Sequence, residues 1–386
     1  MKELFIKSEL QREWVTKLTK LQDSIQRAAD ENDRLSRFPR KTIQTLVEMG
    51  YTQLGLPKEL GGSGMTVSDL ILFQETLASY DGATALSIGW HQGVIGDLFE
   101  KRTWTQNQLD QFAIDIQNGA LVNRAASEAQ TGSPVRGGRP QTEAVLVEEG
   151  WRITGRKTFT SMSPVLTHFL VTAWIEERKG LGTFLIKRTD EGVSIDQTWD
   201  MVGMRATESH DLVLQQVYVP AERLVEFSSA PRSEKVNGWL LHIPACYLGI
   251  AQAARDYAVN FAIHYSPNSI QGTIATLPNV QSAIGHMDLE LSKARHVLYS
   301  VAEAYDDLAR RPLLQQELGV AKQTVTNAAI RIVDQAMRIV GAKSLEMSCP
   351  LQRYYRDVRA GLHNPPMDDM VISKLAANAI KAAEGK

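Results

Sequence analysis

Apolar residues recur at helical spacing through the first third of the chain. One such stripe consists of Trp14, Leu18, Leu21 and Ile25. The segment from Thr66 to Asp69 is typical of a helix start, because a Thr and an acidic residue three positions later can cap each other's backbone N–H groups. The pattern predicts a helical domain.

Between about Gly119 and Val225 the pattern changes to short alternating runs separated by turn residues. Residues 144–147 and 151–153 flank Glu148-Glu149-Gly150, an arrangement typical of a β-hairpin. Further strands are predicted at residues 167–175, 182–187 and 210–219. Short strands at such intervals indicate a barrel or a sandwich.

Helical spacing returns after about Ser233. Two long apolar stripes, separated by Pro312, run from Ile284 to Tyr305 and from Leu314 to Val340. Long helices with short connections indicate an antiparallel bundle. The order of helices, strands and helices predicts an α+β multidomain protein, and it excludes an alternating βαβ sheet and with it most nicotinamide dehydrogenases.

Charge and cysteine content narrow the choice of partner. The 42 basic and 44 acidic residues nearly cancel, so nothing favours nucleic acid or an anionic membrane. Cys246 and Cys349 stand far apart without ligand spacing, which predicts neither a disulfide framework nor a metal site. The chain has no run of ~20 apolar residues that would span a membrane, and its N-terminus lacks the apolar core of a signal peptide. We therefore expect a cytoplasmic protein.

Familiar catalytic motifs are absent or incomplete. Residues 150–158 depart from a P-loop at Arg156, where a Lys is required, and they lie across a predicted hairpin. The sequence has no G-x-S-x-G, H-E-x-x-H or G-x-G-x-x-G motif. Pattern and composition alone favour an enzyme without naming its reaction.

Five segments in the right order resemble the acyl-CoA dehydrogenase family over nearly the whole chain. They are residues 50–62, 126–133, 153–161, 202–207 and 210–220. The resemblance implies an N-terminal α-helical domain at residues 1–119, a middle β-barrel at 120–228 and a C-terminal four-helix bundle at 229–386. It also implies a flavin between barrel and bundle, a homotetramer or homodimer, and an acyl-CoA as the small-molecule substrate.

Residues 126–133 resemble the family's flavin-contacting Thr-Glu-Pro-x-x-Gly-Ser-Asp segment. The resemblance implies that Ser127 and the backbone around Ala126 hydrogen-bond the pyrimidine end of the flavin ring. Ser133 would lie toward the phosphates.

Residues 153–161 resemble the family's second flavin strand. Phe159 would pack on the ring, and Thr160 and Ser161 would contact its reactive nitrogen and the neighbouring atom. Hydroxyl and backbone donors favour the anionic reduced flavin, and an aromatic wall excludes water. The alternative that these Ser and Thr residues merely decorate exposed strands stays open, since strands are rich in both.

The sequence departs from the family at the catalytic base. Acyl-CoA dehydrogenation needs a carboxylate that removes an α-proton. One family position for it, after Arg356-Asp357, falls on Pro365, and the other falls near Trp239. Neither side chain can accept a proton, which leaves Asp368, Asp369 or Glu234 as candidate bases after a small loop shift.

A second departure concerns the cofactor's tail. Dehydrogenases of the family grip the FAD diphosphate of a neighbouring subunit with an Arg-x-x-Phe-Gly stretch, and the corresponding residues 261–268 contain no Arg. Residues 338–342 replace a Gln-x-x-Gly-Gly turn, in which Gly341 is the surviving cofactor-binding position. FAD is the expected cofactor, with FMN as the alternative because the Arg is missing.

A His-x-Pro-type segment after the Arg-Asp motif instead resembles reduced-flavin monooxygenases of the same fold, including dibenzothiophene monooxygenase-like proteins. His363 is the candidate for handling protons near the flavin, because imidazole titrates near neutral pH. A surface or helix-capping role for His363 stays open. For His91 we expect a buried, hydrogen-bonded side chain.

Three functions are consistent with this sequence. A dehydrogenase would oxidise an acyl-CoA thioester and pass electrons to a separate electron-transfer protein. A monooxygenase would take reduced flavin from a partner flavin reductase and use oxygen. A catalytically inert family member is the third. The sequence ranks the dehydrogenase first, because most sequences with this overall pattern belong to that class.

Overall fold

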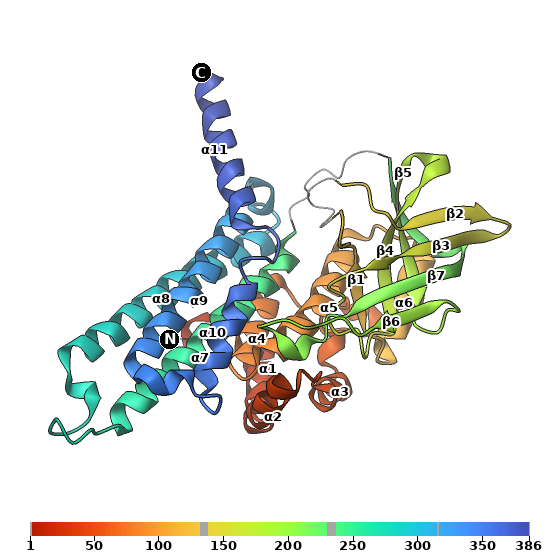
Figure 1. Cartoon of the computed structure of the whole chain (residues 1–386). Coiled ribbons are helices and arrows are strands. Elements are labelled where there is room, and N and C mark those ends of the chain that lie inside the picture. The colour runs from red at the N-terminus through yellow and green to blue at the C-terminus, as the bar shows by residue number, and fades with distance from the viewer. Residues whose placement is uncertain (1, 132–137, 230–236, 315, 386) are drawn as a thin grey trace.

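A computed structural model of the chain describes residues 2–131, 138–229, 237–314 and 316–385. The elements follow the predicted order of helices, sheet and helices (Figure 1). The N-terminal group consists of α1 (Glu9–Thr19), α2 (Gln22–Leu35), α3 (Arg40–Glu48), α4 (Val67–Ala78), α5 (Gly82–Lys101) and α6 (Gln106–Gln117).

The predicted helix start at Thr66 is confirmed. The hydroxyl of Thr66 accepts from the backbone N–H of Asp69 at 3.3 Å, and the Asp69 carboxylate accepts from the N–H of Thr66 at 3.0 Å. This reciprocal cap begins α4, which is covered by other elements on nearly every side. The centre of the helical core therefore lies along α4.

The middle of the chain forms one eight-stranded sheet. Its strands are β1 (Val122–Ala125), β2 (Glu143–Val147), β3 (Gly150–Lys157), β4 (His168–Ile175), β5 (Gly180–Lys187), β6 (Val193–Asp196), β7 (Asp211–Pro220) and β8 (Leu224–Ser228). The strand order is β6-β7-β3-β2-β4-β5-β8, and β1 pairs in parallel with β4. The predicted hairpin is the antiparallel pair of β2 and β3. The predicted barrel takes the form of this sheet, in which β6 and β8 are the edges within the described strands.

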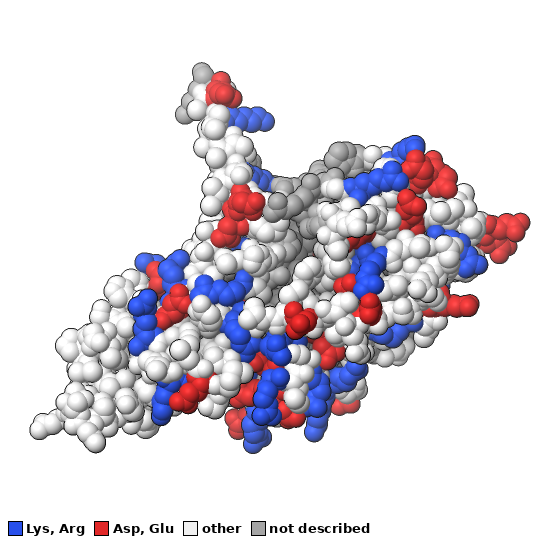
Figure 2. All heavy atoms as spheres, in the orientation of Figure 1, with Lys and Arg blue, Asp and Glu red and all other residues white. Residues whose placement is uncertain are grey.

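The C-terminal helices are α7 (His242–His264), α8 (Pro278–Asp306), α9 (Glu317–Val340), α10 (Pro350–Ala360) and α11 (Asp368–Glu384). The two predicted apolar stripes supply the buried faces of α8 and α9. In Figure 1, α11 projects away from the body of the molecule. No helix within the described ranges is long and apolar enough to cross a membrane. Charges of both signs are interspersed over much of the face shown in Figure 2.

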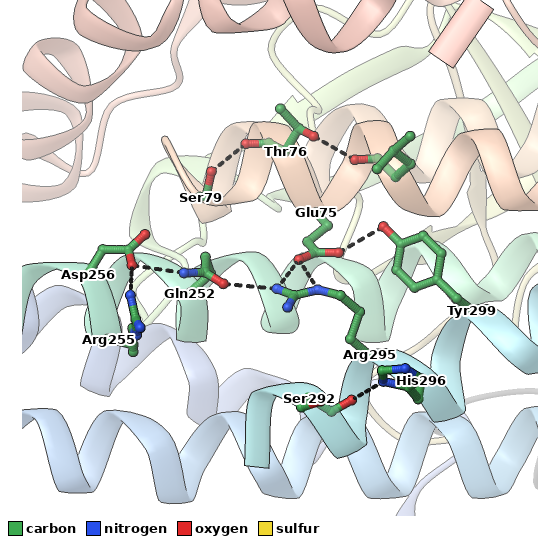
Figure 3. Close-up of polar contacts among 11 residues, drawn as sticks. Glu75, Thr76, Ser79, Gln252, Arg255, Asp256, Ser292, Arg295, His296 and Tyr299 are labelled. Atoms are coloured by element: carbon green, nitrogen blue, oxygen red, sulfur yellow. Dashed lines mark hydrogen bonds and ion pairs between the residues drawn. The ribbon is translucent and has the colours of Figure 1, made fainter. Parts of the chain in front are cut away.

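A fully buried ion pair joins α4 to the C-terminal helices (Figure 3). Two nitrogens of the Arg295 guanidinium donate to one carboxylate oxygen of Glu75, at 2.6 and 3.0 Å. The hydroxyl of Tyr299 donates to the other oxygen at 2.8 Å, and Arg295 also donates to Gln252 on α7 at 2.9 Å. One network therefore fixes α4 against α7 and α8.

The sheet domain is tied to the helices by the Arg-Asp motif on α10. The buried carboxylate of Asp357 accepts from the backbone N–H of Met204 at 2.6 Å, and burial raises the pKa of Asp357 to about 7. The guanidinium of Arg356 binds the carboxylate of Asp33 on α2 and the carbonyl oxygen of Val202. The motif therefore sets the position of the sheet domain relative to the bundle.

Breaking the buried pair should cost far more stability than breaking an exposed one. We expect Arg295→Met to lower the free energy of unfolding by about 3–5 kcal/mol, because it leaves the Glu75 carboxylate buried without its counter-charge. As the matched control, Arg331→Met removes the more exposed pair between Arg331 on α9 and Glu290 on α8, and we expect a loss of about 0–1 kcal/mol.

Urea unfolding followed by circular dichroism measures both changes. The double variant Glu75→Leu/Arg295→Met should recover part of the lost stability, since neither charge is then stranded. Equal losses for Arg295→Met and Arg331→Met would contradict the role given to the buried pair.

Candidate functional site

Two segments that lie far apart in the sequence, residues 126–128 and 157–161, meet on one side of the sheet domain. We call this surface the wall. The backbone N–H of Thr158, which follows β3, donates to the carbonyl oxygen of Ser127, which follows β1, at 2.9 Å. Ala126 and Ser127 are half-buried there. The structure thus brings together the two segments that the sequence assigned to the flavin.

A buried ion pair between the two segments holds them together. The Lys157 ammonium donates to the Glu128 carboxylate at 2.6 Å, and both side chains are almost inaccessible to water. Burial opposes ionisation of Glu128, but hydrogen bonds from Lys157, the Thr142 hydroxyl and the Gln141 N–H hold its pKa at about 2. Glu128 is therefore a charged anchor for this loop.

Phe159 stands out from this wall. Its backbone has a φ of 56°, a left-handed conformation that an aromatic residue rarely adopts. The side chain is 58% exposed and meets the edge of Trp199, with ring centroids 5.9 Å apart. An exposed aromatic side chain held in a strained conformation is the kind of surface that a planar ligand covers.

The hydroxyls on either side of Phe159 lack partners. The side-chain oxygens of Thr158 and Thr160 are buried and make no hydrogen bond among the described residues. Leaving a buried hydroxyl unpaired costs about 1–3 kcal/mol, so such groups are uncommon in native cores and indicate a missing partner. A ligand with polar ring atoms would supply it.

Ser161 is held by its neighbours. Its hydroxyl accepts from the Ser209 hydroxyl at 2.8 Å, and its carbonyl oxygen accepts from the Asn123 side chain at 3.1 Å. Ser161 is nearly buried. The Ser161 hydroxyl can still donate its own proton, and its contact with the flavin remains a prediction.

The other predicted cofactor-binding positions lie elsewhere. Ser133 falls outside the described residues. Gly341 ends α9 with a φ of 69°, in the helical bundle rather than at the sheet wall. Cofactor binding by Gly341 remains a prediction.

The candidate acid–base residues lie in the bundle. Asp368 begins α11, where its carboxylate accepts from Asn327 at 2.7 Å and lies 3.4 Å from the buried Lys322 ammonium of α9. Asp369, the next residue, is exposed. His363 is exposed beyond the end of α10, and its backbone N–H donates to Ala360 at 3.0 Å. The roles of all three as catalytic groups remain predictions, and Glu234, the further candidate base, falls outside the described residues.

A chain of contacts links the wall to α10. Phe159 touches Trp199, and the Trp199 indole N–H donates to the carbonyl oxygen of Met204 at 3.2 Å. Met204 in turn donates to Asp357, six residues before His363. The loop that carries His363 is held further by a hydrogen bond from the Tyr247 hydroxyl to Asn364.

His91 is buried, as expected, and both ring nitrogens have partners. Nε2 lies 3.0 Å from the carbonyl oxygen of Thr52, and Nδ1 accepts from the N–H of Val122 at 3.1 Å. His242 at the start of α7 is a different case, because it is buried and neither ring nitrogen makes a hydrogen bond within the described part of the chain. Burial lowers the pKa of His242 to about 3.

Comparisons with known proteins identify the family. Residues 8–108, 123–217 and 241–364 match the N-terminal, middle and C-terminal domains of acyl-CoA dehydrogenases. A putative acyl-CoA dehydrogenase of Bacillus subtilis, YdbM, is 58% identical over 379 residues, which cover 98% of this chain and 100% of that protein. This chain belongs to the acyl-CoA dehydrogenase family of flavin-dependent oxidoreductases.

Relatives with other reactions are also similar. L-evernosamine nitrososynthase from a Micromonospora species is 29% identical over 86% of this chain and 81% of its own length. The structure of KijD3 in complex with FMN and dTDP-3-amino-2,3,6-trideoxy-4-keto-3-methyl-D-glucose superposes with a TM-score of 0.85 at 25% identity, covering 97% of this chain and 94% of that one. The family uses flavin, as FAD in acyl-CoA dehydrogenases and FMN in some relatives, and the unpaired hydroxyls and exposed ring of the wall fit such a group.

Sequence reasoning missed several residues of the wall. Thr158 belongs to the segment at residues 153–161, and its position next to Phe159 could have identified it as a flavin-binding candidate. Trp199, Ser209 and Asn123 come from other strands and loops, and only the three-dimensional pairing of these segments brings them to the site.

Removing an unpaired hydroxyl should affect flavin binding and leave stability intact. We expect Thr160→Val to weaken flavin binding about 2- to 13-fold, the equivalent of one buried hydrogen bond of about 0.5–1.5 kcal/mol. The flavin-free protein should lose no stability, because the hydroxyl has no hydrogen-bond partner in the part of the chain that the structure describes.

Flavin fluorescence titration and thermal unfolding check this pair of outcomes. The control is Thr76→Val, which removes a hydroxyl that donates to Leu72 within α4 at 2.7 Å. If both variants bind flavin as tightly as the unchanged protein, Thr160 does not face the ring.

Proposed function

We propose that this chain is a monooxygenase that uses reduced flavin from a separate reductase, together with oxygen, to oxidise a small molecule. The observation that carries the proposal is the lack of a proton-accepting carboxylate at either family position. A dehydrogenase needs such a base within hydrogen-bond reach of the substrate's α-carbon. A monooxygenase of the same fold does not.

Trp239 occupies one of these positions and is held firmly. It lies in a short 3-10 helix (Gly238–Leu241), and its buried ring packs over Gly96 on α5, where any side chain would overlap the indole. The indole N–H donates to the Glu100 carboxylate at 3.3 Å. The Tyr305 hydroxyl donates to the same carboxylate at 2.6 Å. Because the Trp239 indole is fixed by this packing and by its hydrogen bond, it cannot move aside to let a carboxylate take its position.

The carboxylates near the other position are poorly suited to replace the missing base. Pro365 stands at the position itself. Asp368 is partnered by Asn327 and by the buried Lys322. Each of the two Asp368 carboxylate oxygens therefore already faces a donor from α9.

His363 is the group that we propose for proton handling. Its imidazole is exposed, it follows α10, which binds the backbone of Met204, and an imidazole can both give and accept a proton. A bound reduced flavin supplies the electrons and the reaction with oxygen. The wall of Thr158, Phe159 and Thr160 orients the ring and limits its access to water.

The comparisons support both this function and a second candidate. The nitrososynthase and FMN-bound relatives favour oxygen-dependent chemistry. The 58% identical relative favours acyl-CoA dehydrogenation. In that second function Asp368 or Asp369 acts as the base and an electron-transfer protein receives the electrons.

We propose FMN as the flavin that the chain retains, with FAD as the alternative. Phe261 stands where the family's diphosphate-binding Arg is expected, and its ring stacks on Tyr265 with centroids 4.9 Å apart. A stacked aromatic pair cannot supply the cation that pairs with a diphosphate.

We also propose that two or four copies assemble through the end of the bundle. Residues 257–287 contain no Lys, Arg, Asp or Glu, and the tip of the bundle at the lower left of Figure 2 shows no charged side chains. Interface cores are depleted of charge in the same way. Light scattering that showed only monomer at micromolar concentration would count against the assembly. A cytoplasmic location also remains our prediction.

The two candidate functions separate under anaerobic conditions. We expect acyl-CoA esters of every chain length to leave the absorbance of the flavin-loaded protein unchanged, because neither Pro365 nor Trp239, at the two family positions, can take the α-proton. After chemical reduction, admitting oxygen should reoxidise the flavin, and His363→Asn should change the pH dependence of that rate. The control His264→Asn removes an exposed imidazole on α7 and should change nothing.

Stopped-flow absorbance measures both steps. Bleaching of the flavin by any ester would contradict the monooxygenase proposal and favour the dehydrogenase. The variants Asp368→Asn and Asp369→Asn would then identify the base. Equal pH profiles for the unchanged protein and His363→Asn would remove His363 from the mechanism.

The identity of the flavin is tested separately. Denaturing the purified protein and separating the released cofactor should yield FMN. Phe261→Arg should raise the affinity for FAD, because it restores the missing cation, and it should leave the affinity for FMN unchanged. Release of FAD alone, with no effect of Phe261→Arg on either affinity, would contradict the assignment.

A further inference from the structure

Three buried hydroxyls form a line that begins at the wall. Ser161 belongs to the wall segment at residues 157–161, Thr207 ends a short 3-10 helix (Arg205–Thr207), and Ser209 lies just before β7. The Ser209 hydroxyl donates to the Ser161 hydroxyl at 2.8 Å, and the hydroxyl oxygens of Ser209 and Thr207 are also 2.8 Å apart. All three side chains are buried. Of the three, the family resemblance assigns Ser161 alone to the flavin.

The carbonyl oxygen of Met204 fixes the direction of this line. It accepts from the Trp199 indole N–H at 3.2 Å and from the backbone N–H of Thr207 at 3.1 Å. The Thr207 hydroxyl is a third donor to the same oxygen, at 2.9 Å. A carbonyl oxygen has two lone pairs, so one of the three donors is surplus. The two N–H groups are held by the backbone and by a packed ring, whereas the hydroxyl can rotate toward Ser209.

The direction of the line leaves the Ser161 proton free. Each hydroxyl has one proton to donate. With Thr207 donating to Ser209 and Ser209 donating to Ser161, the Ser161 proton cannot point back along the line. No acceptor for it is found among the residues that the structure describes. Donation along a chain also polarises each hydroxyl, which strengthens the last donor. The Ser161 hydroxyl is therefore a preset donor.

We infer that Thr207 and Ser209 are positioning residues, which set the Ser161 hydroxyl as a hydrogen-bond donor to a carbonyl oxygen of the flavin ring. The inference rests on the flavin site and on the use of reduced flavin proposed above. The reactive ring nitrogen gains a hydrogen on reduction, so a fixed donor would then face an N–H group. The carbonyl oxygen beside that nitrogen keeps its lone pairs in both oxidation states.

A donor at this oxygen changes the relative stability of the two oxidation states. Reduction adds negative charge to the ring, and the carbonyl oxygens take a share of it. Hydrogen bonds to charged acceptors are stronger than those to neutral ones. The line of hydroxyls therefore favours binding of reduced over oxidised FMN and raises the midpoint potential of the bound flavin. Such a preference suits an enzyme that receives its flavin already reduced.

The midpoint potential of the FMN-loaded full chain, measured by anaerobic equilibration with a reference dye, tests the inference. Ser209→Ala should lower this potential, because the Ser161 hydroxyl can then turn away from the ring. The shift should correspond to a loss of affinity for reduced FMN, relative to oxidised FMN, of about threefold or more. Ser209→Thr keeps the hydroxyl and should keep the potential. Thr207→Val should lower it by a smaller amount, and it gives a second reading should Ser209→Ala fold poorly.

The matched control is Ser163→Ala. The Ser163 hydroxyl is buried in the same loop as Ser161, but it donates to the carbonyl oxygen of Glu208 at 2.7 Å and lies outside the line. Its loss should leave the potential unchanged. An unchanged or raised potential in Ser209→Ala, an equal drop in Ser163→Ala, or failure of the chain to bind FMN would overturn the inference. Bleaching of the flavin by an acyl-CoA ester would contradict the proposed function without altering these potentials.

Discussion

The buried ion pair of Glu75 and Arg295 is the interaction on which the helical core depends. Helix α4 is enclosed by other elements, so a carboxylate in its middle has no access to water and must find its partners within the protein. The pair and its neighbours Tyr299 and Gln252 supply them. Because these side chains come from α7 and α8, satisfying the carboxylate also sets the positions of those helices relative to α4.

Helix α10 connects the helical part of the molecule to the sheet domain. The Arg-Asp motif on that helix binds Asp33 on one side and the backbone around Met204 on the other. Within the sheet domain, Glu128 and Lys157 provide a second sealed ion pair under the loop that carries Ser127. The hydroxyls of Thr158 and Thr160 on the wall itself make no hydrogen bond to any residue that the structure describes. The buried charges of Glu128 and Lys157 are paired, whereas the threonine hydroxyls at the wall have no partner among the described residues. This combination is expected of a surface that binds a polar ligand.

Much of the fold could be predicted because its signals are local. The reciprocal cap of Thr66 and Asp69, the hairpin around Glu149 and the apolar stripes of α8 and α9 each depend on residues within a few positions of one another. The wall was predicted only through a resemblance to known flavoproteins, and its supporting contacts were not predicted at all. Asn123, Trp199 and Ser209 reach it through strand pairing and loop packing between distant segments, which no local period encodes.

The central claim is that the flavin ring lies against the wall formed by Thr158, Phe159 and Thr160. A crystal structure of the protein loaded with FMN tests it most directly. The account predicts electron density for the ring beside Phe159, with ring polar atoms within hydrogen-bond distance of the Thr158 or Thr160 hydroxyls. Density for the ring at any other place, with both threonine hydroxyls still unpaired, would contradict it.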